Sequence, residues 1–459
     1  MSIERLTDED EFMLWPDEVW PQDIGALAVL DGRTLFDPVG RLRIGAVRDL
    51  VAERLHLVPR FRQLLRVPPP HLGGPLWVDA PAFDITQHVA ARSLPSPADE
   101  AVLLRAVEQL RRQRLDRSRP LWEMWLLPGL PEDRIGLFVR MHHTIADGMA
   151  GIATVAAFLD RSSDVAHFPP PRWLPAPAPS EPDLRDDERR RRSRRHRQAL
   201  SGFMHPVATA HRAASVLPAM RELVAQRPGP ATSLDRLVGP DRRLALIRST
   251  LPAVTGIARA HGATVNDVLL AATAGGLRQL LLARGEPVAG VQLPIYVPVS
   301  LHRGPPTQAR GNLIAQMVVP LPVGAAEPVR RLRIIAEQTA RRKATVRPPL
   351  AMVPHRGVAG RVMLRLVARQ RVNLTSADLT GPDAPLHLAG APVLEVFPLV
   401  QLIGTVTLAV GALSYAGRFG IMVVADGDTY PDLDLLVAGV EAELRALARR
   451  GSEPGRQRR

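Results

Sequence analysis

The stretch MHHTIADG, residues 141–148, decides how this chain is interpreted. It follows residues 135–141 (IGLFVRM), an apolar run that predicts a buried strand. It precedes residues 148–159, where apolar side chains recur with the period of a helix. A strand end followed by a tight turn presents side chains into a cleft rather than into the core. The sequence therefore predicts a strand–turn–helix unit with two histidines at its turn.

The residue types in this turn suggest acid–base chemistry. A neutral imidazole is the natural general base near neutral pH, which makes His142 and His143 candidate catalytic residues. Gly148 permits close approach of the backbone, and Asp147 can cap the following helix or form an ion pair. Two alternatives stay open: hydrogen-bonded structural histidines with Asp147 as the N-cap, or a metal site with three ligands. Adjacent strand residues point to opposite faces, which disfavours the metal site.

Composition excludes several classes of chemistry. The chain has 459 residues, enough for two or three domains, with 46% hydrophobic and 23% charged residues, as in globular proteins. Because there is no cysteine, disulfides, Cys-ligated zinc, iron–sulfur clusters and a covalent acyl-cysteine are excluded. Aromatic residues make up only 4%, which disfavours a stacking platform for single-stranded nucleic acid.

The formal net charge of +13 is carried almost entirely by arginine, because Lys343 is the only lysine. Part of the excess is local, since residues 189–197 contain seven arginines. Such a tract can bind nucleic acid, anionic lipid or a polyanionic cofactor, or it can be a solvated tether. No segment resembles a nucleic-acid-binding module, so we expect no nucleic-acid partner.

The chain divides at a change of composition. Residues 167–182 are rich in proline and residues 183–197 form a charge run, and neither can build a packed core. We therefore predict a solvated linker over residues 167–200. The flanking parts, residues 1–166 and 201–459, both mix helical and strand patterns, which predicts α/β (α+β) domains of similar size.

Periodicity predicts the following elements. Helices are expected at residues 47–57, 101–115, 148–159, 207–224, 264–282 and 433–448, and strands at residues 135–141, 244–251, 295–299, 318–321 and 421–424. Residues 396–416 carry no charge and are about as long as a membrane span. Their glycines and β-branched residues predict two buried strands joined by a turn instead. The acidic N-terminus lacks the apolar region of a secretory signal.

Several segments together resemble a known family. HHTIADG matches the HHxxxDG motif of the CoA-dependent acyltransferase superfamily, which includes chloramphenicol acetyltransferase and peptide-synthetase condensation domains. LDRSRPLW (residues 115–122) and GATVNDV (residues 262–268) resemble segments of bacterial wax ester synthase/acyl-CoA:diacylglycerol acyltransferases, and their order is specific to these lipid enzymes. One departure is notable: the family usually carries an SNVPGP-like turn where this chain has Ala377–Thr380 before Gly381 and Pro382.

The resemblance implies two chloramphenicol-acetyltransferase-like domains with an active-site tunnel between them. It implies that His143 is the general base, that His142 supports it, and that Asp147 is ion-paired with an arginine and holds the turn beside Gly148. It also implies that further residues line the substrate site: Asn266, Asp267, Pro120, Leu121 and Trp122. Each of these has a structural alternative. Thr264 to Asp267 also reads as a helix capping box, and the segment ending in Trp122 also reads as a turn anchored by a buried tryptophan.

The implied enzyme is an O-acyltransferase, a diacylglycerol O-acyltransferase or wax ester synthase. It would move a long-chain acyl group from acyl-CoA to diacylglycerol or a long-chain alcohol, with no covalent acyl-enzyme and no cofactor besides the acyl-CoA co-substrate. The expected location is the cytoplasm, peripheral at the inner face of the plasma membrane or at lipid bodies. Two alternatives are a condensation-type or polyketide-associated acyltransferase that uses a carrier-bound acyl group, and a weakly active lipid-binding paralogue.

Overall fold

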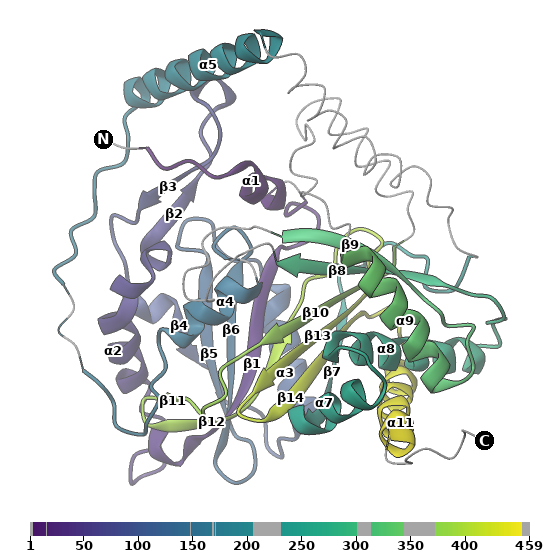
Figure 1. Ribbon diagram of the computed structural model, residues 1–459. Helices are drawn as coiled ribbons and strands as arrows, with labels where there is room; N and C mark the ends of the chain where they lie inside the picture. Colours follow the sequence, from purple (N-terminus) through teal and green to yellow (C-terminus); the bar gives the residue numbers. More distant parts are fainter. Residues whose placement is uncertain are drawn as a thin grey trace.

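Two six-stranded sheets form the centre of the protein (Figure 1). The computed structural model describes residues 3–14, 16–146, 148–167, 169, 171–204, 231–300, 314–343 and 372–451. In this part of the chain, helices and strands are mixed throughout, as the sequence predicts for an α/β (α+β) protein. A small third sheet pairs β2 (Gln63–Arg66) with β3 (Leu76–Asp79) at the periphery.

The first sheet has the strand order β11-β12-β1-β6-β5-β4. Its strand β1 runs antiparallel to both neighbours, so Gly25 faces Leu399 on one side and Arg140 on the other. Glycine is needed there, because an added Cβ would lie 2.2 Å from the Val139 carbonyl oxygen. Strands β11 and β12 come from beyond the predicted linker, so both halves of the chain build this sheet. The strands are β1 (Asp23–Asp31), β4 (Val89–Ala91), β5 (Trp122–Pro128), β6 (Arg134–His142), β11 (His387–Leu388) and β12 (Ala391–Leu399).

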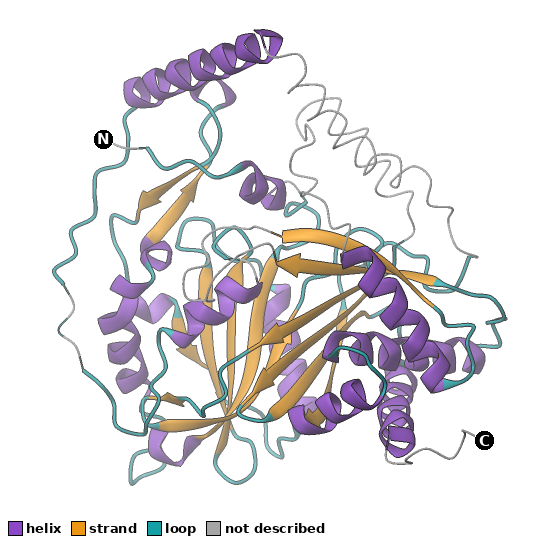
Figure 2. Cartoon of the chain, viewed as in Figure 1, coloured by secondary structure: helices purple, strands orange, loops and turns teal. Residues whose placement is uncertain are grey.

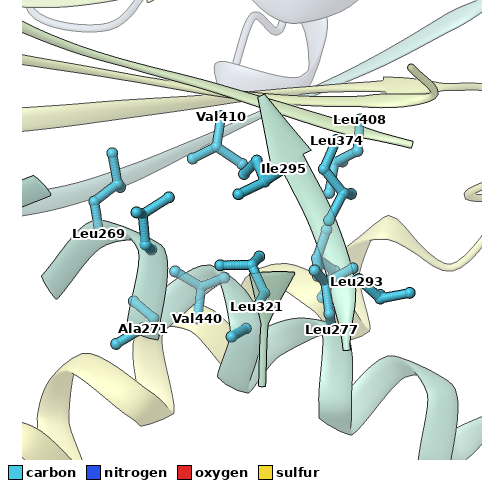
Figure 3. Close-up of a cluster of buried hydrophobic side chains, with 14 of the residues drawn as sticks. Leu269, Ala271, Leu277, Leu293, Ile295, Leu321, Leu374, Leu408, Val410 and Val440 are labelled. Atoms are coloured by element: carbon cyan, nitrogen blue, oxygen red, sulfur yellow. The ribbon is translucent and has the colours of Figure 1, made fainter. Parts of the chain in front are cut away.

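The second sheet has the strand order β7-β14-β13-β10-β8-β9. Strand β10 runs parallel to both β13 and β8, whereas the other pairs are antiparallel. Leu269 and Leu277 of helix α8 pack against Ile295 and Leu374 of the sheet (Figure 3). The strands are β7 (Arg242–Thr250), β8 (Leu293–Ser300), β9 (Ile314–Leu321), β10 (Leu374–Thr380), β13 (Leu408–Tyr415) and β14 (Arg418–Asp426).

Helices cover the two sheets (Figure 2). In the second half of the chain, α8 contacts α7, α9 and α11, so these four form one layer. The helices are α1 (Asp8–Leu14), α2 (Ile44–Arg54), α3 (Glu100–Arg112), α4 (Gly148–Ala156), α5 (Glu181–Met204), α7 (Leu251–Ala260), α8 (Val265–Ala283), α9 (Pro328–Lys343) and α11 (Leu433–Gly451). Short 3-10 turns lie at Gly32–Leu35, Leu55–Leu57, Pro59–Arg62, Pro70–Leu72 and Ile85–Gln87.

Most predicted elements are confirmed within a few residues, because their periodicity reports a buried face. The helices expected at residues 101–115, 264–282 and 433–448 correspond to α3, α8 and α11. The expected pair of strands within residues 396–416 is also confirmed, as β12 and β13. The helix expected at residues 207–224 lies outside the described residues. No helix among the described residues combines the length and apolarity needed to cross a membrane.

An apolar core joins the two sheets. Leu27 of β1 and Phe138 of β6 share a buried cluster with Met422 and Val424 of β14. Phe397 of β12 belongs to the same cluster, and β12 contacts both β13 and β14. Buried apolar area of this kind contributes about 25 cal/mol per Å². The two sheets are therefore held in one arrangement by a shared core rather than by a flexible connection.

The charge run of residues 183–197 is a helix, and the prediction of a solvated tether is wrong there. This run lies within α5, which stands at the periphery of the molecule (Figure 1). Leu184 is fully buried against Leu72 and Val78, and the Arg5 Nε donates to Asp187 Oδ2 at 2.7 Å. Ion pairs one turn apart, such as Arg192 with Glu188, further support the helix. Alternating charges thus form a docked helix instead of a tether.

Candidate active site

The MHHTIADG stretch forms the predicted strand–turn–helix unit. Strand β6 ends at His142, a turn follows, and α4 begins at Gly148. His143 lies in the turn with only 7% of its surface exposed, and its backbone N–H donates to the Gln22 carbonyl at 2.8 Å. Ile145 packs between two apolar clusters, so the turn is anchored on both sides. The fourth candidate, Asp147, lies outside the described residues.

The ring of His142 is held by hydrogen bonds at its Nδ1. Its Nδ1 accepts the backbone N–H of Thr144 at 3.1 Å, and the Thr144 hydroxyl lies 2.9 Å from the same nitrogen. A backbone N–H can only donate, so this Nδ1 carries the lone pair and the neutral ring carries its proton on Nε2. That Nε2 lies 3.3 Å from Oδ1 of Asp17. The lone pair of His142 is therefore already occupied within the turn.

Asp17 is a buried partner of His142 that the sequence interpretation missed. Its carboxylate accepts the Gln22 backbone N–H at 2.8 Å and the guanidinium of Arg117 at 2.6 Å. Burial by itself raises the pKa of Asp17, but the hydrogen bonds from His142, Gln22 and Arg117 outweigh it and hold that pKa well below the usual value. Asp17 is thus ionised at neutral pH.

Beneath the turn lies a second buried charge cluster that the sequence interpretation also missed. Arg140, two residues before His142, is 1% exposed and pairs with Asp23 at 3.3 Å and with Glu123 at 2.8 Å. Its guanidinium also donates to the Gln113 carbonyl at 2.7 Å. Burial raises the pKa of Asp23, and Arg140 opposes that rise. The only sequence signal is an arginine inside an otherwise apolar strand, which requires a partner.

The structure brings Pro120, Leu121 and Trp122 next to the histidines. The Leu121 carbonyl accepts the His142 N–H at 2.9 Å, because β5 begins beside the end of β6. All three residues are buried, and Trp122 has no exposed surface. The indole stacks on Phe61 with ring centroids 4.3 Å apart and donates to the Phe61 carbonyl at 2.9 Å. This arrangement fits a buried anchor behind the turn.

Asn266 and Asp267 lie in the second half of the molecule, in the first turn of α8. Asp267 closes the predicted capping box: its Oδ2 accepts the backbone N–H and hydroxyl of Thr264 at 2.8 and 2.7 Å. Its Oδ1 accepts the Thr339 hydroxyl at 2.6 Å. Asp267 is 2% exposed, whereas Asn266 is half-buried and makes none of these capping bonds. Of this pair, Asn266 has the side chain available for a ligand.

Strand β10 connects the two halves of the candidate site. It contacts α4 on the one hand and α8 on the other, so the helix after the histidines reaches the second sheet. Residues Ala377–Thr380, expected to form a turn, are the last part of this strand. Gly381 and Pro382, the two residues kept from the family's turn, come directly after the strand. That expectation is wrong because residues 374–380 pair in register with β13.

The described residues contain no group of three or more histidine, aspartate or glutamate side chains arranged to hold a metal ion. His143 itself offers a buried imidazole whose backbone is held by the Gln22 carbonyl. Such a setting suits proton transfer, since a base shielded from water acts on a group placed beside it.

Comparison with known proteins identifies the family. A family model for the wax ester synthase/diacylglycerol acyltransferase catalytic domain matches residues 6–269, and one for the WS/DGAT C-terminal domain matches residues 310–448. A probable diacylglycerol O-acyltransferase of Mycobacterium tuberculosis is 32% identical over 441 residues, which cover 93% of this chain and 92% of that protein. Another M. tuberculosis protein named as a diacylglycerol O-acyltransferase is 29% identical, with 98% and 99% of the two chains covered.

Solved structures show the same fold. The wax ester synthase/diacylglycerol acyltransferase from Marinobacter aquaeolei has a TM-score of 0.69 at 21% identity, with 98% of this chain and 100% of that chain covered. A starter condensation domain of rhizomide synthetase has a TM-score of 0.63 at 14% identity, with 98% and 95% covered. The first family model covers more than half of the chain and carries both histidines. The chain therefore belongs to the wax ester synthase/diacylglycerol acyltransferase family.

Proposed function

We propose that the protein transfers a long-chain acyl group from acyl-CoA to the hydroxyl of diacylglycerol or of a long-chain alcohol, with His143 as the general base. The observation that carries the assignment of the base is the engaged lone pair of His142. The Nδ1 lone pair of His142 accepts the Thr144 N–H, and its Nε2 faces the Asp17 carboxylate. His142 thus has no lone pair left for a substrate proton, which leaves the role to His143.

The reaction is a direct transfer. His143 takes the proton of the acceptor hydroxyl as that oxygen attacks the thioester carbonyl carbon. The new carbon–oxygen bond forms, the carbon–sulfur bond breaks, and the imidazolium returns its proton to the CoA thiolate. General-base help of this kind contributes roughly 10²–10⁴-fold in rate. The chain has no cysteine to form an acyl-enzyme through a thiol, and no cofactor besides the acyl-CoA co-substrate is required.

The remaining site residues take supporting roles in this proposal. Asn266 lines the site from the second domain, and Asp267 holds the start of its helix. Pro120, Leu121 and Trp122 form the wall behind the turn, and Asp147 holds the turn next to Gly148. A tunnel between the domains would let acyl-CoA and acceptor meet at His143. In chain order the proposed domains are 1–166 and 201–459, with residues 167–200 between them, and β11 and β12 of the second domain complete the first sheet.

The runner-up function is a condensation-type reaction with a carrier-bound acyl group. The similarity to a starter condensation domain favours it at the level of fold. The two family models and the named relatives favour the lipid acyltransferase. The donor separates the two reactions, since one enzyme needs a CoA thioester and the other an acyl group on a carrier protein.

We also propose that the enzyme works in the cytoplasm, peripheral at the inner membrane face or at lipid bodies, because its acceptor and product are lipid-soluble. Helix α5 supports this location. Its arginines at 189, 190, 192, 194, 195 and 197 are all exposed, while Leu184 and Glu188 hold the other face of the helix to the protein. Each basic residue near an anionic lipid surface contributes about 1 kcal/mol. Because α5 is packed against the protein, its exposed arginines form a basic surface in a fixed position.

The experiment is a product assay with labelled palmitoyl-CoA and both acceptors, repeated with a palmitoyl-carrier donor. We expect triacylglycerol or wax ester from the CoA donor only, and loss of both products in His143→Ala. The matched control is His167→Ala, since that histidine is exposed and pairs with Glu53. Turnover of His143→Ala near the wild-type rate would exclude the proposed base, and products from the carrier donor alone would favour the condensation-type reaction.

A further inference from the structure

Asp17 occupies an unusual position for a carboxylate. Its side chain is 9% exposed, yet it lies in the turn of residues 16–20 that precedes β1. Two donors hydrogen-bond to it, the Gln22 backbone N–H at 2.8 Å and Arg117 at 2.6 Å, and the Nε2 of His142 lies 3.3 Å from its Oδ1. A buried carboxylate is retained only with such partners, because losing its hydration costs several kcal/mol.

Arg117 fixes Asp17 from the segment that precedes the site wall. Arg114, three residues earlier, donates to the backbone carbonyls of Asp17 and Glu18 at 2.5 and 2.7 Å. Two arginines therefore hydrogen-bond to the same turn. Asp116 orders this segment by accepting the Ser118 N–H and hydroxyl at 2.9 and 2.7 Å. The LDRSRPLW segment therefore reaches the histidines through Asp17 as well as through its own wall residues.

Asp17 also connects to His143 through the backbone of Gln22. The Gln22 N–H donates to the Asp17 carboxylate, and the Gln22 carbonyl accepts the N–H of His143. The Asp17 carboxylate thus lies against the His142 ring and is connected to His143 through the backbone of one residue, Gln22. A shift of about 1 Å in a reacting group can cost roughly 10²-fold in rate.

We propose that Asp17, held by Arg117, is the positioning residue of the catalytic turn: it keeps His142 in the tautomer with its proton on Nε2 and thereby aligns His143. Asp17 touches neither substrate nor reacting atoms in this role. The part that concerns catalysis rests on the proposed function, whereas the tautomer of His142 is a property of the resting protein.

The central variant is Asp17→Asn. The amide offers one acceptor oxygen where the carboxylate meets the Gln22 N–H, Arg117 and the nearby His142 ring, and its NH₂ group then faces either Arg117 or the His142 Nε2. We expect kcat to fall by roughly 10–100-fold, with KM for palmitoyl-CoA unchanged within about threefold, because the loss is one of alignment. Arg117→Gln gives a smaller fall of the same kind, and Arg117→Lys restores part of it. The matched control, Glu18→Gln, changes an exposed neighbouring carboxylate and leaves kcat unchanged.

The second readout does not depend on activity. Nitrogen NMR of protein labelled at the histidine rings, with the His142 signals assigned by their loss in His142→Gln, reports which ring nitrogen carries the proton. We expect a protonated Nε2 in the wild type, where the Thr144 N–H and the Asp17 carboxylate both favour it. In Asp17→Asn an amide NH₂ facing Nε2 opposes the Thr144 N–H, so we expect a mixture of tautomers at unchanged fold. An inactive wild type with this spectrum would refute the proposed function alone. An unchanged His142 spectrum in Asp17→Asn, with or without loss of kcat, would overturn the positioning role.

Discussion

The neighbouring residues Asn266 and Asp267 offer a sharp separation of structural from catalytic roles. Asp267→Ala removes the acceptor of three hydrogen bonds, two from Thr264 and one from the buried Thr339 hydroxyl. Asp267 is the N3 residue of the capping box and Thr264, the N-cap, is retained. Each hydrogen bond to a charged group contributes about 1.5–3 kcal/mol. These contributions overlap at one site, so we expect a loss of about 3 kcal/mol rather than their sum.

A loss of that size lowers the Tm of the second domain by roughly 6–12 °C. Asp267→Asn keeps one acceptor oxygen and is expected to lose about half as much. Asn266→Ala removes a half-buried side chain without a capping role, so its Tm changes by an amount equivalent to about 0.5 kcal/mol or less. If Asn266 lines the site, the same variant lowers kcat/KM.

The assay combines thermal unfolding by circular dichroism with the labelled palmitoyl-CoA assay at 20 °C, where all variants stay folded. Asp267→Ala is expected to keep its specific activity per folded molecule within about threefold, and Asn266→Ala to keep its Tm. An Asp267→Ala variant with the wild-type Tm and no activity would refute the capping argument and make Asp267 a substrate contact.

Three further predictions test other parts of the molecule. Trp122→Phe keeps the stack on Phe61 but leaves the buried Phe61 carbonyl without its donor. We therefore expect the free energy of unfolding to fall by about 1–3 kcal/mol, with unchanged KM for both acceptors. A changed acceptor KM at wild-type stability would make Trp122 part of the channel. Because folding lowers the pKa of Asp17, its carboxylate stabilises the protein above the unfolded value near pH ~4, and this contribution is lost as the pH falls from there toward the lower folded value. Asp17→Asn is therefore expected to lose stability less steeply between about pH 4 and pH 2, and parallel curves would contradict this. The third prediction concerns vesicle binding by α5. We expect weaker sedimentation with phosphatidylglycerol vesicles at low salt when four exposed arginines of α5 are replaced by Gln: Arg190, Arg194, Arg195 and Arg197. The control replaces four exposed arginines elsewhere, Arg259, Arg330, Arg445 and Arg449, and is expected to leave sedimentation unchanged; an equal loss in both sets would mean that only net charge matters.

The sequence by itself determined the elements with a buried face. The apolar run before the histidines predicted β6, and the spacing of Thr264 and Asp267 predicted the capping box. Both are local patterns, in which a residue's partners lie within one turn or one strand, so periodicity and spacing carry the information. The same holds for the uncharged residues 396–416, where glycine and β-branched residues predicted two strands.

Only the tertiary structure decided which charged residues act together. Asp17 and Arg117 lie 100 positions apart, and Arg140 and Asp23 lie 117 positions apart, so no local pattern links them. The charge run of α5 was predicted as a tether because its composition cannot build a core, yet burial of Leu184 and the ion pair of Arg5 with Asp187 dock it. A single side chain buried by a distant partner changes the state of a segment, and such partners are determined by packing across the whole chain.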